Sequence, residues 1–442
     1  MGLRTPEKLR KLQRALYAKA KREPECRFYS LYDKVYREDI LGHAYALCKS
    51  NGGAPGVDGQ TFKDIEACGV ERWLRELGEE VRTGCYRAQA VRRKMIPKPG
   101  GAGERPLGIP TIRDRVVQRA ALLVIEPVFE ADFDEAAYGY RPGRSAQQAI
   151  RKVHTTLLEG HIQVVDADLT QFFDTIPHEA LMKCLARRIS DGKMLHLIKM
   201  WLKAPVEEKD GEGRRTRTGG KGSTKGTPQG GVVSPLLANL YFHRFIKAFR
   251  KFGLDVKYGA VLVNYADDFV LLCRRGAKKA LEETRKVMRA IGLELNERKT
   301  RTVNARRKHF DFLSYTFGPQ YWWQTGRPYL GAIPSKKAVA RMREKVRRLL
   351  RPSQLAQWPE VAESLNRMLR GWANYFSYGS AWRARGCVDA HVAEKVRHFL
   401  RRRSGSKKGR QLRKYGPARV FGELGVLSTQ RLPSQGRANA LA

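Results

Sequence analysis

The chain has 442 residues, of which 85 are Lys or Arg and 44 are Asp or Glu, so its formal net charge is +41. Such a charge favours a polyanionic partner, with binding that weakens steeply as salt rises. No stretch approaches the roughly 18 uncharged apolar residues of a membrane-spanning helix, and the N-terminus lacks the apolar core of a signal peptide, so we expect a cytoplasmic protein with no membrane partner.

The seven cysteines are scattered and contain no Cys-x-x-Cys pair. This spacing argues against a zinc ribbon and against a disulfide scaffold. The length predicts about two to four domains.

Two basic segments lie in the N-terminal part of the chain. At its start, Leu9, Leu12 and Leu16 share one face of a predicted helix whose other faces are cationic. This helix either packs on the next domain or grips nucleic acid. Further along, Lys98 and Arg105 flank a Gly-rich loop, and glycine lets a backbone approach a ligand closely.

An acidic segment, VVDADLTQFFDTIP, occupies residues 164–177. It begins as a short apolar strand that contains Asp166 and Asp168. The aromatic pair Phe172 and Phe173 follows, and Asp174 comes directly after this pair. Composition and spacing do not separate the three acids, so each is a candidate for the same role. Next, residues 207–226 are rich in Gly and charge, which predicts an exposed hairpin loop.

The segment VLVNYADDFVLLC, residues 261–273, has apolar runs of strand length on both sides of Asp267 and Asp268. This pattern predicts a hairpin with its acids at the tip. Two adjacent carboxylates in an apolar setting stay ionised at neutral pH only if cations lie against them, and Mg²⁺ prefers oxygen ligands. With one upstream carboxylate, these acids would form a two-metal site for phosphoryl transfer.

The C-terminal section is strongly basic, because residues 331–442 hold 25 Lys and Arg against 6 Asp and Glu, a net charge of +19. Residues 336–351 keep apolar side chains at helical spacing, with cations on the other faces. Residues 365–382 carry an aromatic stripe that is either the core of a helix bundle or a stacking platform. The basic tail from Arg401 is either disordered or a nucleic-acid contact, and residues 414–427 are expected to form a small packed unit.

Eight ordered blocks resemble the reverse transcriptases encoded by group II introns. A single YADD is a weak signal, whereas eight blocks in the same order are specific. The blocks are GGAPGVDG (52–59), PKPGGAGERPLGIPTIRDRVVQ (97–118), AYGYRPGRSAQQAI (137–150), VVDADLTQFFDTIP (164–177), TPQGGVVSPLLANLYF (227–242), NYADDF (264–269), GLELNERKT (292–300) and FDFLSYTFG (310–318).

The resemblance implies an α+β fold, the right-hand polymerase, with fingers, a palm built on an antiparallel sheet and a helical thumb. The expected divisions are an N-terminal extension (1–50), fingers (51–155), palm with the catalytic site (156–325), thumb or maturase domain (326–395) and a basic nucleic-acid-binding segment (396–442).

The resemblance selects Asp168 as the upstream metal ligand beside Asp267 and Asp268, which leaves Asp166 and Asp174 as structural residues. It implies two Mg²⁺ ions, for which Mn²⁺ is a possible substitute. It also implies a set of substrate-binding residues: Lys98, Arg105, Phe172, Phe173, Gln229, Gly230, Asn296 and Lys299.

Each implied substrate contact has a physical reason. Lys98 and Arg105 would hold the incoming triphosphate, one with a compact charge and the other with a fork of donors. Gln229 and Gly230 would contact the nucleotide and template. One of Phe172 and Phe173, with Phe173 favoured, would pack beneath the sugar and exclude a 2′-hydroxyl. Asn296 and Lys299 either assist near the leaving phosphate or form a solvated turn.

The implied function is RNA-directed DNA synthesis, combined with maturase binding of the intron RNA for splicing and retrohoming. The partners would be template RNA, structured intron RNA, a DNA target or primer and deoxynucleoside triphosphates, in a bacterial nucleoprotein particle. We expect no C-terminal nuclease module with paired cysteines. The alternatives are a related bacterial reverse transcriptase of phage defence or CRISPR adaptation, a non-catalytic splicing scaffold, and a basic architectural nucleic-acid binder.

Overall fold

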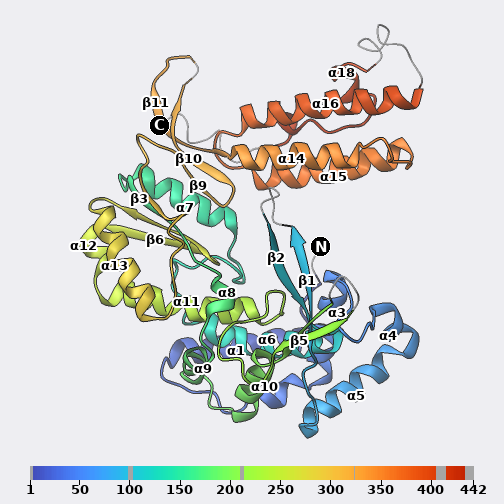
Figure 1. The fold of residues 1–442 in the computed structure, drawn as a ribbon, viewed down its shortest axis with the longest axis vertical. Coiled ribbons are helices and arrows are strands. Elements are labelled where there is room, and N and C mark those ends of the chain that lie inside the picture. Colours follow the sequence, from blue (N-terminus) through green and yellow to red (C-terminus); the bar gives the residue numbers. More distant parts are fainter. Residues whose placement is uncertain (1–2, 98–102, 210–213, 323, 405–414, 434–442) are drawn as a thin grey trace.

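The computed structural model describes residues 3–97, 103–209, 214–322, 324–404 and 415–433. The described strands form three antiparallel or mixed sheets, and helices pack around them (Figure 1). The fold is therefore α+β. In Figure 1 the sheet that contains β3 (Gln163–Asp168) and β6 (Ala260–Tyr265) lies at the left, with N-terminal helices at the lower right and the C-terminal helices at the upper right. None of the described helices has the length and the apolar run needed to cross a bilayer.

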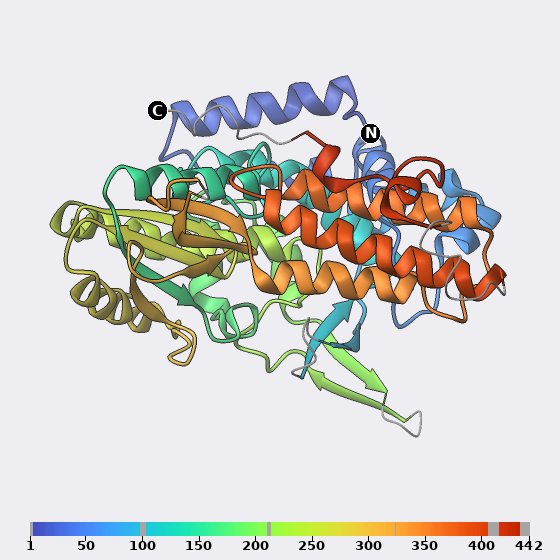
Figure 2. The same ribbon diagram turned by 90° about the horizontal axis from the view of Figure 1, so that it is seen from above.

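The N-terminal helices pack around α6 (Ile112–Glu130), which is buried along most of its length. The predicted amphipathic helix is α1 (Glu7–Arg22), and its Leu9 and Leu16 are buried in the cluster that also contains α6. Figure 2 shows α1 lying along the outer edge of the molecule. The other helices of this region are α2 (Tyr32–Val35), α3 (Glu38–Asn51), α4 (Phe62–Cys68) and α5 (Val70–Thr83).

The first sheet combines two hairpins that are far apart in sequence. The hairpin of β1 (Val91–Pro97) and β2 (Glu104–Ile109) pairs, through β1, with β4 (Pro205–Lys209) in parallel, and β4 pairs with β5 (Arg215–Gly219). The hairpin expected within residues 207–226 is thus present and its β5 is exposed. Its attachment to β1 was not expected, because it joins a segment of the predicted palm to the predicted fingers.

The second sheet has the order β6-β7-β3-β8, with every neighbouring pair antiparallel. β6 and β7 are apolar over most of their length, as expected for strands of a sheet whose two faces are covered. On one face Val164 and Val270 join the cluster of α7, whereas on the other Val165 and Leu271 join that of α11 and α13. The elements are α7 (Ala146–Leu158), β3 (Gln163–Asp168), α11 (Ser234–Lys251), β6 (Ala260–Tyr265), β7 (Asp268–Cys273), α13 (Ala277–Ala290) and β8 (Arg301–Asn304).

A third, smaller sheet leads into the C-terminal helices. Its strands are β9 (Phe310–Phe312), β10 (Tyr315–Tyr321) and β11 (Pro328–Pro334), and the helices are α14 (Lys336–Leu349), α15 (Trp358–Tyr375) and α16 (Trp382–Ser404). Met342, Val346 and Leu369 are buried in a separate core between these helices. The helix predicted over residues 336–351 is therefore confirmed, and it ends at Leu349.

The aromatic stripe of residues 365–382 is mainly core. Phe376 is buried, and Trp372 and Tyr375 pack in the same cluster as Tyr315 of β10, so the rings join the helices to the third sheet. Trp382 differs, because 61% of it is exposed. The expected small unit after the basic tail is also present: Val420 and Val426 are buried beside α18 (Pro417–Val420).

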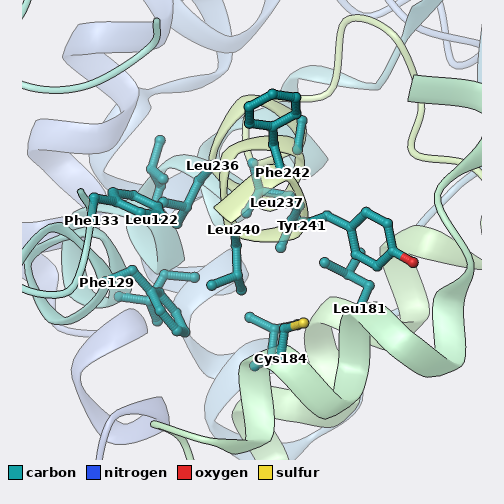
Figure 3. Packing of buried hydrophobic residues seen from close by; sticks show 14 of the residues in the cluster. Leu122, Phe129, Phe133, Leu181, Cys184, Leu236, Leu237, Leu240, Tyr241 and Phe242 are labelled. Carbon is teal, nitrogen blue, oxygen red and sulfur yellow. The ribbon is translucent and has the colours of Figure 1, made fainter. Parts of the chain in front are cut away.

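The remaining short elements connect these layers. They are α8 (Phe172–Thr175), α9 (His178–Ala186), α10 (Gly192–Leu202), α12 (Leu254–Tyr258) and a 3-10 helix (Thr429–Arg431). Both α9 and α11 contribute to the largest core, which continues into α6 and is drawn from close by in Figure 3.

Candidate active site

The register of the second sheet brings the acidic segments together. Asp168, the last residue of β3, lies directly opposite Asp268, the first residue of β7. Asp267 occupies the tip of the hairpin, because Tyr265 pairs with Asp268 and only Ala266 and Asp267 lie between them. The hairpin predicted from residues 261–273 is confirmed, with its acids at the tip.

The tip has a specific conformation that two neighbours support. Ala266 has a φ of 58°, which is uncommon for a residue other than glycine. The Asn264 side chain donates a hydrogen bond to the Ala266 carbonyl at 2.8 Å. Behind the turn lies Gly139, where an added Cβ would meet the Ala266 nitrogen at 2.5 Å, so only glycine fits this approach.

The acids oppose one another's ionisation. Loss of hydration, followed by the negative charges of Asp267, Asp168 and Asp166, raises the pKa of Asp268 to about 7. Loss of hydration and the charge of Asp168 also raise the pKa of Asp267. Both residues nevertheless keep exposed surface, so an ion or substrate can reach them. Such a cluster is stabilised by an added cation.

Lys299 supplies one positive charge to this cluster. Its Nζ donates to Asp168 Oδ2 at 2.7 Å, and this hydrogen bond raises the pKa of Lys299. Asn296 builds the turn that presents the lysine, since its N–H donates to the Asp168 carbonyl and its own carbonyl accepts from Thr300 N–H, both at 2.8 Å. The predicted pair of Asn296 and Lys299 therefore lies at the acids, within a turn.

The residues present fit a divalent metal by their chemistry, because carboxylate oxygens are the ligands that Mg²⁺ prefers. Among the described residues, no group of three or more Asp, Glu, His or Cys side chains is arranged so that it could hold a metal ion. Lys299 occupies one oxygen of Asp168. The fit therefore rests on the shared position and charge of the acids, and an ion could bind the second oxygen of Asp168 or replace Lys299 at the first.

The two other upstream acids have different partners. Asp166 lies two residues before Asp168 on β3 and forms an ion pair with Arg301 at 3.1 Å. Asp174 accepts a hydrogen bond from the Gln229 side chain at 3.3 Å. Loss of hydration raises the pKa of each acid.

The loop carrying Gln229 and Gly230 joins the first sheet to the segment after β3. Thr227 N–H donates to the Phe173 carbonyl at 2.7 Å, and Gly108 N–H on β2 donates to the Gln229 carbonyl at 2.6 Å. Gly230 has a φ of 114°, and an added Cβ would lie 2.2 Å from the Gly108 oxygen. Glycine is required there by the close approach of two backbones.

The aromatic pair is divided between core and surface. Phe172 is 3% exposed and packs edge-on against Phe242 of α11, as expected for a core residue. Phe173 is only partly buried and stands over Phe172 with ring centroids 5.7 Å apart. Of the two rings, Phe173 is the one that a substrate can reach.

The cations of the Gly-rich loop are partly described. Arg105 is exposed on β2 opposite Ile96, and its positive charge acts to lower the pKa of Asp267, so it stands within electrostatic reach of the acids. Lys98 lies outside the described residues.

Tyr140 is a site residue that the sequence did not single out. Its φ is 56°, its side chain is half exposed, and partial burial together with the charge of Asp267 raises its pKa. Arg105 acts in the opposite direction on the same hydroxyl. The residue lies inside the block of residues 137–150, but nothing in the block marks its left-handed backbone conformation.

Comparisons with known proteins agree with this geometry. Residues 96–331 match the family "Reverse transcriptase (RNA-dependent DNA polymerase)", and residues 339–416 match "Group II intron, maturase-specific domain". Protein YkfC of Escherichia coli is 34% identical over 329 residues, which cover 66% of this chain and 83% of YkfC.

Intron-encoded proteins are also similar. The group II intron-encoded protein LtrA of Lactococcus lactis is 35% identical over 222 residues, covering 50% of this chain and 35% of LtrA. A 91 kDa protein in the cob intron of Schizosaccharomyces pombe is 33% identical over 214 residues, covering 48% of this chain and 25% of that protein. The chain thus spans most of YkfC but about a third or less of these two relatives.

The family match covers the acidic hairpin, the upstream acids, β2 and the hairpin of β4 and β5, and it begins within β1. The α+β fold of a right-hand polymerase, expected from the sequence, is confirmed by this match together with the sheets and helices described above. The chain belongs to the reverse transcriptases, the RNA-directed DNA polymerases, and is one of the group II intron type that carries a maturase-specific domain.

Proposed function

We propose that this reverse transcriptase joins deoxynucleotides at Asp168, Asp267 and Asp268 with the help of two Mg²⁺ ions. Reverse transcriptases in general use divalent metals, and the specific ions and ligands are our assignment. The observation that carries it is the register of β3 and β7, in which Asp168 stands opposite Asp268. Ions held there would activate the primer 3′-hydroxyl and neutralise the triphosphate and the leaving pyrophosphate.

The surrounding residues act on the substrates. Arg105 binds phosphate oxygens of the incoming nucleotide with its fork of donors. Lys299 holds Asp168 in place before the substrate arrives, and afterwards offers its charge to the leaving phosphate. Lys98 and Asn296 remain proposed contacts of the same nucleotide.

The template side of the site is formed by the loop after residue 226. Gln229 and Gly230 contact the base pair that is being formed, and the backbone contact of Gly230 with β2 fixes that loop against the fingers. Phe173 packs beneath the sugar and excludes a 2′-hydroxyl, while Phe172 supports it from the core.

The maturase role concerns the C-terminal helices. On α14, Met342 and Val346 are buried, whereas Arg343, Lys345 and Arg347 are exposed at different positions around the helix, so its solvent-facing surface is cationic. RNA recognised by its shape and backbone requires such a broad basic surface. We propose that this face binds intron RNA and promotes splicing and retrohoming.

The domain divisions follow from this proposal. We assign residues 1–50 to an extension, 51–155 to fingers, 156–325 to palm and 326 onward to the thumb. Because α16 runs without a break from Trp382 to Ser404, we extend the thumb to Ser404 and begin the basic segment after it. We also count the hairpin β4–β5 with the fingers sheet.

Primer extension on an annealed RNA template, with Mg²⁺ and four deoxynucleotides, tests the catalytic proposal. We expect Asp168→Asn, Asp267→Asn and Asp268→Asn each to reduce extension by at least about a hundredfold, because each removes a metal ligand. Asp166→Asn is the matched control on the same strand and should keep most activity. If Asp166→Asn abolished primer extension and Asp168→Asn retained it, Asp166 would be the metal ligand and Asp168 the structural residue.

The same assay distinguishes a catalytically active polymerase from a non-catalytic splicing scaffold. If the wild-type protein binds RNA tightly but extends no primer under any divalent metal, the non-catalytic splicing scaffold is the better description. A separate splicing assay with the Asp267→Asn protein then tests whether RNA assistance is independent of the acids.

A further inference from the structure

A cavity of about 680 Å³ opens between the loop after α1 and the helices α6, α9 and α11. Its apolar wall is made by Phe129, Phe133 and Leu240, with Cys184 beside them. Figure 3 shows Phe129, Cys184 and Leu240 converging from α6, α9 and α11. None of the acids or substrate contacts of the active site lines it, so it is a separate feature of the fold.

The rim of the cavity is cationic. Arg187 and Lys247 are exposed at its edge, and within the described part of the chain neither forms a hydrogen bond or an ion pair through its side chain. Six Lys and Arg side chains line the cavity against two acids, Glu25 and Asp132, and Asp132 is already paired with Arg188 at 3.1 Å. The rim therefore presents positive charge that the protein itself does not neutralise, which favours an anionic ligand.

A buried polar group without a partner also lines this cavity. His243 on α11 is 6% exposed, and neither of its ring nitrogens has a hydrogen-bond partner among the residues that the structure describes. Burial, assisted by the charge of Lys247, lowers the pKa of His243 to about 4, so the ring is neutral at pH 7 and carries one donor and one acceptor. Buried polar groups without partners are rare in folded proteins and are satisfied by a ligand or water.

We propose that this cavity binds one nucleotide, with its phosphate on Arg187 and Lys247 and its base between His243 and the apolar wall. The volume is within the range of nucleotide-sized ligand sites. The nucleotide is either free in solution or a residue extruded from a bound RNA strand. The phosphate and base recognised are the same in both cases.

Calorimetric titration of adenosine 5′-monophosphate into the full chain tests whether the cavity binds a free nucleotide. EDTA is included so that metal-dependent binding at the active site is suppressed. We expect saturable binding that weakens at least tenfold in Arg187→Gln/Lys247→Gln and in His243→Phe, and at least tenfold when adenosine replaces the monophosphate. Lys251→Gln/Lys278→Gln removes the same charge from exposed positions outside the cavity and should change the affinity less than twofold.

Photocrosslinking tests whether the nucleotide in the cavity is a residue of a bound RNA strand. RNA substituted with 4-thiouridine is bound to the full chain and irradiated, and crosslinked peptides are identified by mass spectrometry. Crosslinks at α9 and α11 that disappear in Arg187→Gln/Lys247→Gln identify an RNA residue as the occupant. Equal weakening by the control pair, or the absence of both binding and crosslinks, would overturn the proposal without affecting the assignment of the catalytic acids.

Discussion

Asp268 is a carboxylate whose surroundings work against its charge. Three other acids and the loss of hydration raise its pKa to about 7, and only Lys299 acts in the opposite direction among its main influences. A folded protein keeps such a group when a ligand compensates it. The cost of assembling the acids is therefore itself a reason to expect cations at this position.

Phe173 should govern the choice of sugar. Phe173→Ala removes the partly exposed ring and leaves room for a 2′-hydroxyl, so we expect ribonucleotide incorporation to rise by about tenfold or more relative to deoxynucleotides. Competing incorporation of both nucleotide types during primer extension measures this ratio.

Phe172→Leu is the control for the aromatic pair. Because Phe172 is buried, its truncation should lower the free energy of unfolding by about 1 kcal/mol without changing sugar selectivity. A change in selectivity with Phe172→Leu and none with Phe173→Ala would move the gate to Phe172.

His243 should make folding stability depend on pH. Its pKa is lowered to about 4 by burial, then by Lys247, while Asp134 raises it and Arg141 lowers it further. As pH falls, the unfolded chain takes up the proton before the folded chain does, so the free energy of unfolding decreases by about 2 kcal/mol between pH 7 and pH 5.

Denaturant unfolding at the two pH values measures this contribution. His243→Phe should remove it, and His196→Gln, which changes an exposed histidine on α10, should leave it unchanged. An unaltered pH dependence in His243→Phe would show that other groups are responsible.

At the scale of elements, the acidic hairpin is positioned by a segment far from it in sequence. The backbone of Gly139 lies against the turn of β6 and β7, and Asn264 exchanges backbone hydrogen bonds with Ala136 and Tyr138, both under 3 Å. The tip of the hairpin is therefore held from outside the sheet as well as by strand pairing.

Gly139→Ala should displace the hairpin tip. The new Cβ would meet backbone atoms that have no side-chain freedom, so we expect at least about a tenfold loss of primer extension with the chain still folded. Gly192→Ala is the matched control, since an added Cβ there meets no atom within 4 Å. Equal activity of both variants would mean that the turn is positioned by its strands alone.

The sequence predicted those elements whose pattern is local. The apolar runs on both sides of Asp267 and Asp268 predicted the hairpin of residues 261–273, and the apolar spacing of residues 336–351 predicted α14. It did not predict that Asp168 stands opposite Asp268, because a strand register is determined by long-range pairing. The backbone of Tyr140 could not be predicted either, since a left-handed residue other than glycine is imposed by its surroundings.

At the scale of the whole molecule, charge determines how the chain meets nucleic acid. The net charge of +41 includes +19 from residues 331–442, and exposed cations of α14 surround the side of the helix that is buried in the C-terminal core. Binding should therefore combine a general attraction with a specific surface on α14.

Salt titration of RNA binding tests how much of the binding comes from general attraction and how much from the cations of α14. The logarithm of the binding constant should fall linearly with the logarithm of salt concentration, and Arg343→Gln/Lys345→Gln should reduce the slope by about 1.5, since each phosphate contact contributes about 0.7 to 0.9. Lys278→Gln/Lys279→Gln removes the same charge from α13 and should reduce the slope less. Equal slopes for the two variants would argue against a specific role for α14.

The parallel pairing of β1 with β4 has a consequence for how such chains can be divided and exchanged. The first sheet is completed by a hairpin encoded more than 90 residues after its first strands, beyond β3 and the helices α8, α9 and α10. A fragment ending before residue 205 would leave an edge of β1 open to association with other chains. Modules exchanged between related polymerases should therefore retain their function only when residues 91–219 are inherited together.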